Sequence, residues 1–88
     1  MIIQQERLKE HLTQGPFLQL PLATQALYLH LIANMDDEGV ADIEVARRLC
    51  GADDKAIPPL YEAAFIRGGG DSLIRVLSAK FLQGGDME

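Results

Sequence analysis

The chain has 88 residues, of which 48% are apolar, and its 8 basic and 13 acidic side chains give a formal net charge of −5. This length favours one domain with a single small core, and the acidic balance argues against a protein that tracks nucleic-acid phosphates over its whole surface. No apolar run approaches the roughly 20 residues of a membrane span, and no signal-peptide pattern is seen. The single cysteine, Cys50, can form neither an internal disulfide nor a cysteine-based zinc site. We therefore expect a protein of the reducing cytoplasm that does not contact membranes.

The first predicted element is a helix over residues 3–13. Leu8 and Leu12 lie one turn apart on one of its faces. Gly15-Pro16 ends it, because glycine suits a helix C-terminus and proline cannot continue a helix. The apolar face is thin, so this helix needs a surface to pack against. We predict that residues 1–16 form an N-terminal helix and linker able to act as an oligomerisation arm.

A second helix, predicted from residue 21 or 22 to residue 35, has the strongest pattern in the chain. One set of apolar residues recurs at helical spacing: Leu22, Ala26, Leu29 and Ala33. A second set widens that stripe: Leu27, Leu31, Ile32 and Met35. A helix that is apolar around most of its circumference is typical of the centre of a core. The acidic residues 36–38 with Gly39 then predict a solvated turn after the helix.

The next stretch predicts a trace of strand and a capped helix. Val40-Ala41 is long enough for only one rung of a strand. Asp42 is a favourable N-cap for a helix over residues 43–50, and Gly51 is a favourable C-terminal stop. The residues expected to face inward are Ile43, Ala46, Leu49 and Cys50.

Residues 52–64 are interrupted by Pro58-Pro59. Because a proline disfavours helical geometry in the residue before it, we predict a turn over residues 53–57 and a short helix from Pro58 or Pro59 to Ala64. Its inner face is expected to consist of Leu60, Tyr61 and Ala64.

A glycine run at residues 68–70 separates two short apolar segments, residues 65–67 and 72–77, which favours a β-hairpin. Residues 79–82 are predicted as a brief helical or irregular end, and residues 83–88 as a disordered tail. The complete order predicts a mainly α (α+β) fold: a winged helix-turn-helix domain over residues 17–82, with a three-helix core, a C-terminal β-hairpin and an extra N-terminal helix.

Within this domain the run FLQLPLATQALYLHL at residues 17–31 closely resembles the opening of phage replisome-organiser N-terminal domains, which are relatives of the DnaD-type primosome proteins. The turn DDEGV at residues 36–40 resembles the acidic turn that follows in that family. Leu60, Phe65-Ile66, the glycine run and the segment 73–77 then come in the family's order. The first run is the specific part of a resemblance that covers residues 17–77.

The resemblance implies a winged-helix domain used for self-assembly and for contacts in replication initiation. Members of the family help to open or organise DNA at an origin and recruit the replicative helicase through its loader. The implied partners are therefore a second copy of the chain and replication-initiation proteins, the helicase or helicase loader. The chain departs from the family after its last strand, where SAKF at residues 78–81 replaces a frequent His-Trp pair.

Charge divides unevenly along the chain, at −5 over residues 1–46 and +2 over residues 47–83. Nucleic-acid contacts are therefore expected in the second half, and the candidate DNA-binding residues are Arg47, Arg48, Lys55, Arg67 and Arg75. The outward positions of the short helix lack the side chains that read base edges, being Pro58, Pro59, Glu62 and Ala63. We expect weak contact with phosphates, or only a solvated set of charges, rather than sequence reading.

The candidate residues for self-association are Ile3, Leu8, Leu12 and Phe17, which would leave a poorly buried apolar strip on a lone domain. Exposed apolar strips mark interfaces, so we predict a homo-oligomer built by residues 2–20 with the edge of the hairpin. The alternative is that this strip packs against its own domain.

No motif predicts catalysis, a cofactor or a metal. The run Gly68-Gly69-Gly70 lacks the Gly-Lys-Ser/Thr ending of a phosphate-binding loop, and residues 36–39 lack the spaced acids of a calcium loop. His11 and His30 do not stand at metal-ligand spacing, and no Ser/His/acid set points to a nucleophilic enzyme.

The leading hypothesis is a domain that assembles a replication-initiation complex with at most weak DNA contact. One alternative is a small sequence-specific winged-helix transcriptional regulator, and another is a protein-docking domain unrelated to replication.

Overall fold

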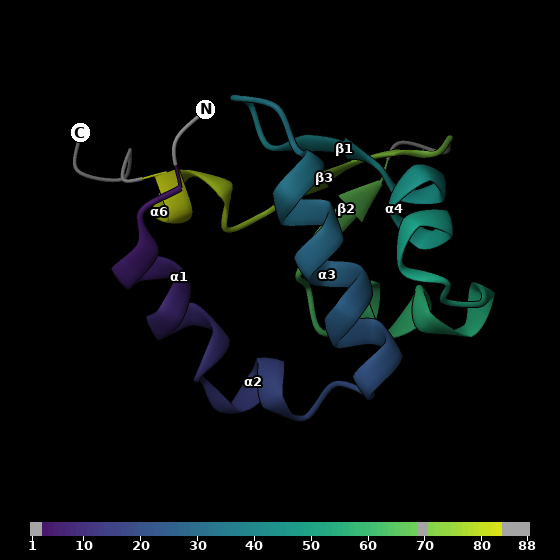
Figure 1. The fold of residues 1–88 in the computed structure, drawn as a ribbon, viewed down its shortest axis with the longest axis horizontal. Coiled ribbons are helices and arrows are strands. Elements are labelled where there is room, and N and C mark those ends of the chain that lie inside the picture. The colour runs from purple at the N-terminus through teal and green to yellow at the C-terminus, as the bar shows by residue number, and fades with distance from the viewer. Residues whose placement is uncertain (1–2, 69–70, 84–88) are drawn as a thin grey trace.

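The computed structural model describes residues 3–68 and 71–83 as an α+β protein in which helices dominate, as the sequence predicts (Figure 1). Its elements follow the order α1 (Gln5–Leu12), α2 (Gly15–Leu18), α3 (Leu22–Asn34), β1 (Val40–Asp42), α4 (Ile43–Cys50), the 3-10 helix η1 (Asp54–Ala56), α5 (Pro58–Glu62), β2 (Ile66–Gly68), β3 (Leu73–Val76) and α6 (Ala79–Gln83). α3 runs through the middle of the molecule, with α4 to one side and α1 to the other (Figure 1).

Three antiparallel strands form one sheet in the order β1-β3-β2. Arg75 of the central strand β3 pairs with Val40 of β1 and with Arg67 of β2. Ile74 and Val76 face the core while Arg75 faces solvent, as the alternation of a strand requires. The predicted hairpin is confirmed, although Gly69 and Gly70 at its tip lie outside the described residues. The prediction of a single rung at residues 40–41 is wrong, because β3 offers β1 a partner along three residues.

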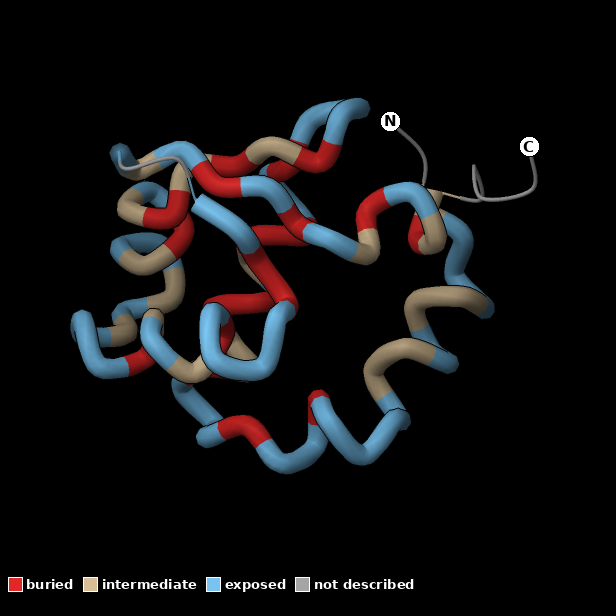
Figure 2. Tube along the Cα trace, turned by 180° about the vertical axis from the view of Figure 1, so that it is seen from behind, coloured by how far each residue is buried: buried red, intermediate tan, exposed pale blue. Residues whose placement is uncertain are grey.

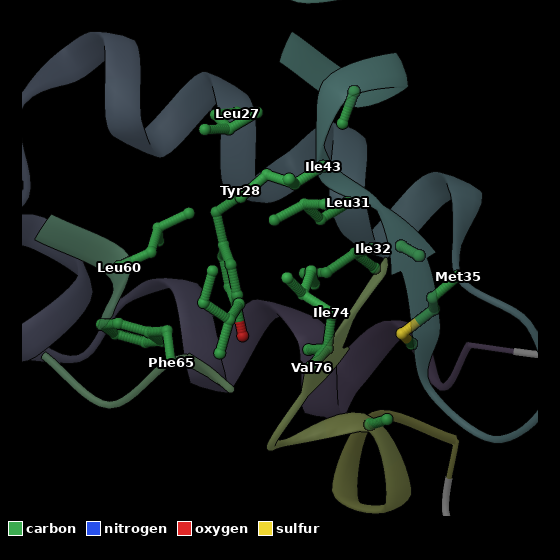
Figure 3. Packing of buried hydrophobic residues seen from close by; sticks show 14 of the residues in the cluster. Leu27, Tyr28, Leu31, Ile32, Met35, Ile43, Leu60, Phe65, Ile74 and Val76 are labelled. Carbon is green, nitrogen blue, oxygen red and sulfur yellow. The ribbon is translucent and has the colours of Figure 1, made fainter. Parts of the chain in front are cut away.

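α3 is the central core helix that its composition predicts (Figure 3). Its buried residues are Thr24, Leu27, Tyr28, Leu31 and Ile32, with Met35 just beyond its end. The prediction that the first set of apolar residues faces the core is wrong, since Leu22 is 82% exposed and Leu29 and Ala33 also face solvent. A helix that is apolar nearly all round gives no amphipathic signal, so packing alone chose its buried side.

α4 begins and ends where the sequence predicts. Asp42 Oδ1 accepts hydrogen bonds from the N–H groups of Glu44 and Val45 at 3.0 and 3.2 Å, and Gly51 adopts a left-handed φ of 74°. The inward face is narrower than predicted: Ile43 and Ala46 are buried, but Leu49 is 60% exposed. This helix is two turns long and packs on α3 along one side only, which leaves Leu49 facing solvent.

The proline pair divides the following segment as predicted, into η1 and α5. Leu60 is buried, whereas Tyr61 and Ala64 are exposed, so the prediction that these two face inward is wrong. α5 is shorter than expected because Ala64 turns left-handed at φ 62°. The N–H groups of Ala64 and Phe65 then bond to the carbonyls of Tyr61 and Leu60, which closes the helix as a Schellman motif.

The N-terminal segment packs against the end of the domain (Figure 1). The backbone N–H of Gln4 donates to the Leu82 carbonyl at 2.7 Å, and Arg7 Nη1 donates to the Phe81 carbonyl at 3.3 Å, so α1 lies along α6. Gly15-Pro16 does not merely stop α1: it starts α2, with proline in the first turn, so the predicted boundary after residue 16 falls inside a helix. Gln83 closes α6 instead of beginning a disordered tail, and residues 84–88 lie outside the described residues.

Burial is concentrated where α3, the inner face of the sheet and α4 meet, while α1 contains no buried residue (Figure 2). Between α1 and α3 the space is filled by rings. Tyr28 stacks edge-on to Phe65 with centroids 5.0 Å apart, and Phe17 lies 5.8 Å from Tyr28. The aromatic cluster of Phe17, Tyr28 and Phe65 therefore joins α2 and α3 to the start of the hairpin.

Candidate interaction surfaces

The four predicted self-association residues do not form an exposed strip. Phe17 is 4% exposed and belongs to the core, and Ile3, Leu8 and Leu12 are half-buried against that core. The prediction of a poorly buried strip is wrong, because α1 lays its apolar face on its own domain. Whether the chain self-associates stays a prediction.

Large apolar side chains that face solvent are found on α2, α3 and α4 but not on α1. Leu18 at the end of α2 and Leu22 and Leu29 on α3 are exposed, and the latter two are seven residues apart and so share a helix face. Val45 and Leu49 form a second exposed pair on α4. The outer face of α3, which we define by Leu22 and Leu29, is an apolar surface that the sequence pattern assigned to the core.

Among the predicted DNA-binding residues, Arg47 is already engaged. Its guanidinium donates to Glu44 Oε1 at 2.9 and 3.2 Å and to the Ala52 carbonyl at 3.1 Å, and it lies 3.4 Å from Asp54 Oδ1. These contacts tie the end of α4 to the loop that follows. Arg47 therefore acts within the fold and is not a free cation for a phosphate.

Arg67 and Arg75 face each other across β2 and β3 on the solvent side of the sheet. Like charges directly opposite each other repel, so an anion at this point would be stabilised by both. Arg48 and Lys55 are also exposed, but they lie on α4 and η1. The strand register thus brings Arg67 and Arg75 together. In the described residues, no hydrogen bond and no strand pairing links the other three candidates to this pair.

One of these arginines also holds the acidic turn. Arg75 Nη1 donates to the Glu38 carbonyl at 3.0 Å. Asp36 Oδ1 accepts the N–H groups of Val40 and Glu38 at 3.0 and 2.9 Å. These two backbone hydrogen bonds, with a smaller attraction from Arg75, lower the pKa of Asp36 below its ordinary value. The turn at residues 36–39 is therefore a structured cap on the edge of the sheet, as well as an acidic surface.

The outward side of α5 forms one wall of a groove of about 580 Å³, whose lining is Gly15, Pro16, Gln19, Leu20, Pro21, Pro59, Glu62 and Ala63. Glu62 is the one ionisable residue in that lining. α2 and the turn after it form the opposite wall, so α5 does not project alone into solvent. A carboxylate repels phosphates, and the contact it can make to a base edge is to accept a hydrogen bond from the amino group of cytosine.

A polar cluster that the sequence did not predict lies beside this groove. His11 Nε2 is 2.7 Å from the Tyr28 hydroxyl, which is 2.8 Å from Ser78 Oγ, and Ser78 Oγ is 3.4 Å from His11 Nε2. Burial lowers the pKa of His11 and raises the pKa of Tyr28 to about 12. The three residues are 17 and 50 positions apart in the chain, so no local motif could have revealed them.

Two further properties bear on function. In residues 3–68 and 71–83 no three histidine, cysteine, aspartate or glutamate side chains gather as the ligands of a metal ion would. None of the described helices combines the length and the hydropathy needed to cross a membrane. His30 does not join the His11 cluster, since its Nδ1 lies 3.0 Å from the Ala26 carbonyl of its own helix.

Comparisons with known proteins add no relative. No protein-family model matches the chain, and neither the curated proteins nor the solved structures contain a match. The resemblance to replisome-organiser domains therefore stays a prediction from the residues.

Proposed function

We propose that this chain is a non-enzymatic winged-helix domain of the replisome-organiser kind, which acts in the cytoplasm by assembling a replication-initiation complex through self-association and docking of the helicase or its loader. The observation that supports the proposal is the order of elements, in which α4 and α5 precede the antiparallel strands β2 and β3. This is the order expected of a helix-turn-helix followed by a wing. The run at residues 17–31 supports the assignment to replication.

The character of α5 favours assembly over sequence reading. Its outward residues include Pro59 and Glu62, and it shares a groove with α2. A recognition helix reads bases with Arg, Lys, Asn or Gln side chains at its exposed positions. A helix without them leaves DNA contact to Arg67 and Arg75 of the wing, which would hold phosphates without selecting a sequence.

The surface proposed for self-association is the outer face of α3. Leu22 is 82% exposed, and burial of one such leucine is worth about 1.5–3 kcal/mol. Two exposed leucines on one helix face, Leu22 and Leu29, favour contact with a partner of similar apolar character, and a second copy of the chain brings that same surface. Leu8 and Leu12 could join such a contact only if α1 left its own domain.

The test is sedimentation velocity over a range of micromolar concentrations, with wild type, Leu22→Asp and the control Leu73→Asp, which changes an exposed leucine on the sheet. We expect the wild type and the control to gain mass with concentration and Leu22→Asp to remain a monomer, with circular dichroism confirming that all three fold. A wild type that stays monomeric, or two variants that behave alike, would contradict the proposed surface.

DNA binding by the wild type and by Arg67→Gln separates the proposal from its alternative. We expect the wild type to bind duplexes weakly and to bind unrelated sequences equally well. The slope of log affinity against log salt concentration should be smaller by about one unit in Arg67→Gln than in the wild type. Discrimination between duplexes of about 10³-fold or more would instead indicate a sequence-specific regulator.

A further inference from the structure

The helix α1 is held to the domain with less burial than the other two long helices, α3 and α4. None of its residues is buried, whereas α3 and α4 each bury at least two. Its backbone is tied to the rest of the domain by Gln4 N–H to the Leu82 carbonyl, and Arg7 adds a guanidinium 5.2 Å from the Phe81 ring centroid. An element with few buried contacts opens at lower free energy than the core beneath it.

Besides the half-buried packing of Leu8 and Leu12 on the core, α1 is attached through His11. Its imidazole reaches Tyr28 of α3 and Ser78, the residue that leads from β3 into α6. The ring also lies 5.6 Å from the Tyr28 ring and 5.7 Å from the Phe65 ring. One side chain therefore joins α1 to three other parts of the fold.

The groups around this imidazole are suited to its neutral form. α3 presents the Tyr28 phenol, the start of the hairpin presents Phe65, and the end of β3 presents Leu77 and Ser78. Of these, only the phenol is titratable, and it is uncharged near neutral pH because its pKa is about 12. On its own helix, the neighbouring Glu10 is exposed to solvent, and Arg7, one turn away, donates to the Phe81 carbonyl. A guanidinium is itself a cation and cannot neutralise an imidazolium.

Protons can reach the ring. A pocket of about 280 Å³ opens beside it, lined by His11, Pro16, Ala63, Ala64, Phe65, Leu77 and Ser78. A charge placed on the imidazole would lie partly out of water with no carboxylate among the side chains that line this pocket. An imidazolium is fully solvated only when α1 moves away.

We propose that the cluster of His11, Tyr28 and Ser78 is a proton-sensitive latch: protonation of His11 releases α1 from the domain while α3, α4 and the sheet stay folded. Released α1 exposes its own Leu8 and Leu12 and uncovers the rings of Tyr28 and Phe65 beneath. The proposal stands on the contacts of α1 and does not depend on the proposed function.

The test is an NMR titration of the whole chain between about pH 8 and pH 5, the range in which histidine changes charge. We expect the amide signals of α1 to move toward unstructured positions with the midpoint of the His11 imidazole, while the amides of Leu31 and Ile74 keep their folded positions. Between the pKa of the released imidazole and the lower pKa of the attached one, each unit of falling pH increases the equilibrium constant for release by up to about tenfold.

Two variants sharpen the result. His11→Phe keeps a ring between Tyr28 and Phe65 but takes up no proton, so α1 should stay in place at low pH, whereas the control His30→Phe should behave as wild type. Ser78→Ala keeps the imidazole and should raise the midpoint of release. Signals of α1 that ignore the His11 titration, or core amides that move together with α1, would overturn the latch.

Discussion

At the scale of single residues, Gly39 has the most restrictive position. Its φ is +83°, and it closes the acidic turn through its N–H to the Asp36 carbonyl at 2.9 Å and its carbonyl to the Val76 N–H at 2.8 Å. A β-carbon here would collide with the Ala79 side chain and lie 3.3 Å from the Val76 carbonyl. Gly39 therefore joins the turn, the sheet and α6 at a point where no side chain fits.

We predict that Gly39→Ala lowers the free energy of unfolding by at least about 1–2 kcal/mol, the cost of a left-handed non-glycine residue before the collision is counted. Urea unfolding measures it. Gly15→Ala is the matched control, because nothing lies within 4 Å of the added carbon, and it should change stability by no more than about 0.5 kcal/mol. Equal stability of the two variants would mean that the turn does not need its left-handed residue.

At the scale of elements, α3 shows how one helix divides similar residues between core and solvent. Leu27 is fully buried, and Leu22, five positions earlier, is 82% exposed. Thr24 is buried as well, and it is satisfied because its hydroxyl donates to the Ala56 carbonyl at 3.0 Å. The same helix therefore organises the core with one side and offers an apolar surface with the other.

We predict that Leu27→Ala costs about 2–5 kcal/mol of stability, since it leaves a cavity in the centre of the core. Leu22→Ala should cost no more than about 0.5 kcal/mol, because its side chain is already in water. Thermal unfolding of both variants at low concentration tests the pair. A large loss in Leu22→Ala at low concentration would show that this leucine is buried within the monomer.

At the scale of the whole molecule, His11 and Tyr28 make stability depend on pH from both sides. Burial lowers the pKa of His11 below its ordinary 6.5, so the unfolded chain takes up this proton first as the pH falls. Burial raises the pKa of Tyr28 from 10.0 to about 12, so the unfolded chain loses this proton first as the pH rises. Stability from His11 is complete above its ordinary pKa, and stability from Tyr28 is complete below its ordinary pKa.

We predict a maximum in the free energy of unfolding between about pH 6.5 and pH 10, with a decline on each side. Urea unfolding at a series of pH values measures the curve. His11→Phe should reduce the slope just below pH 6.5, and Tyr28→Phe the slope above pH 10. If both slopes persist unchanged in these variants, other groups control the pH dependence.

Local chemistry by itself determined the limits of several elements. Asp42 and Gly51 bound α4 because a cap needs only the backbone N–H groups of the next turn or one left-handed residue. The glycine run at residues 68–70 likewise indicated a hairpin, and the apolar run at residues 22–35 indicated a core helix. Each of these signals depends on neighbours within a few positions, which are present in the sequence.

Only the tertiary structure decided which faces of these elements are buried. The choice between Leu22 and Leu27 depends on where the sheet and α4 lie, and a helix that is apolar nearly all round does not encode it. The burial of Phe17, the engagement of Arg47 with Asp54, and the meeting of His11, Tyr28 and Ser78 were decided in the same way. The physical reason is that burial and electrostatic environment come from residues distant in the chain, whereas caps and turns come from adjacent ones.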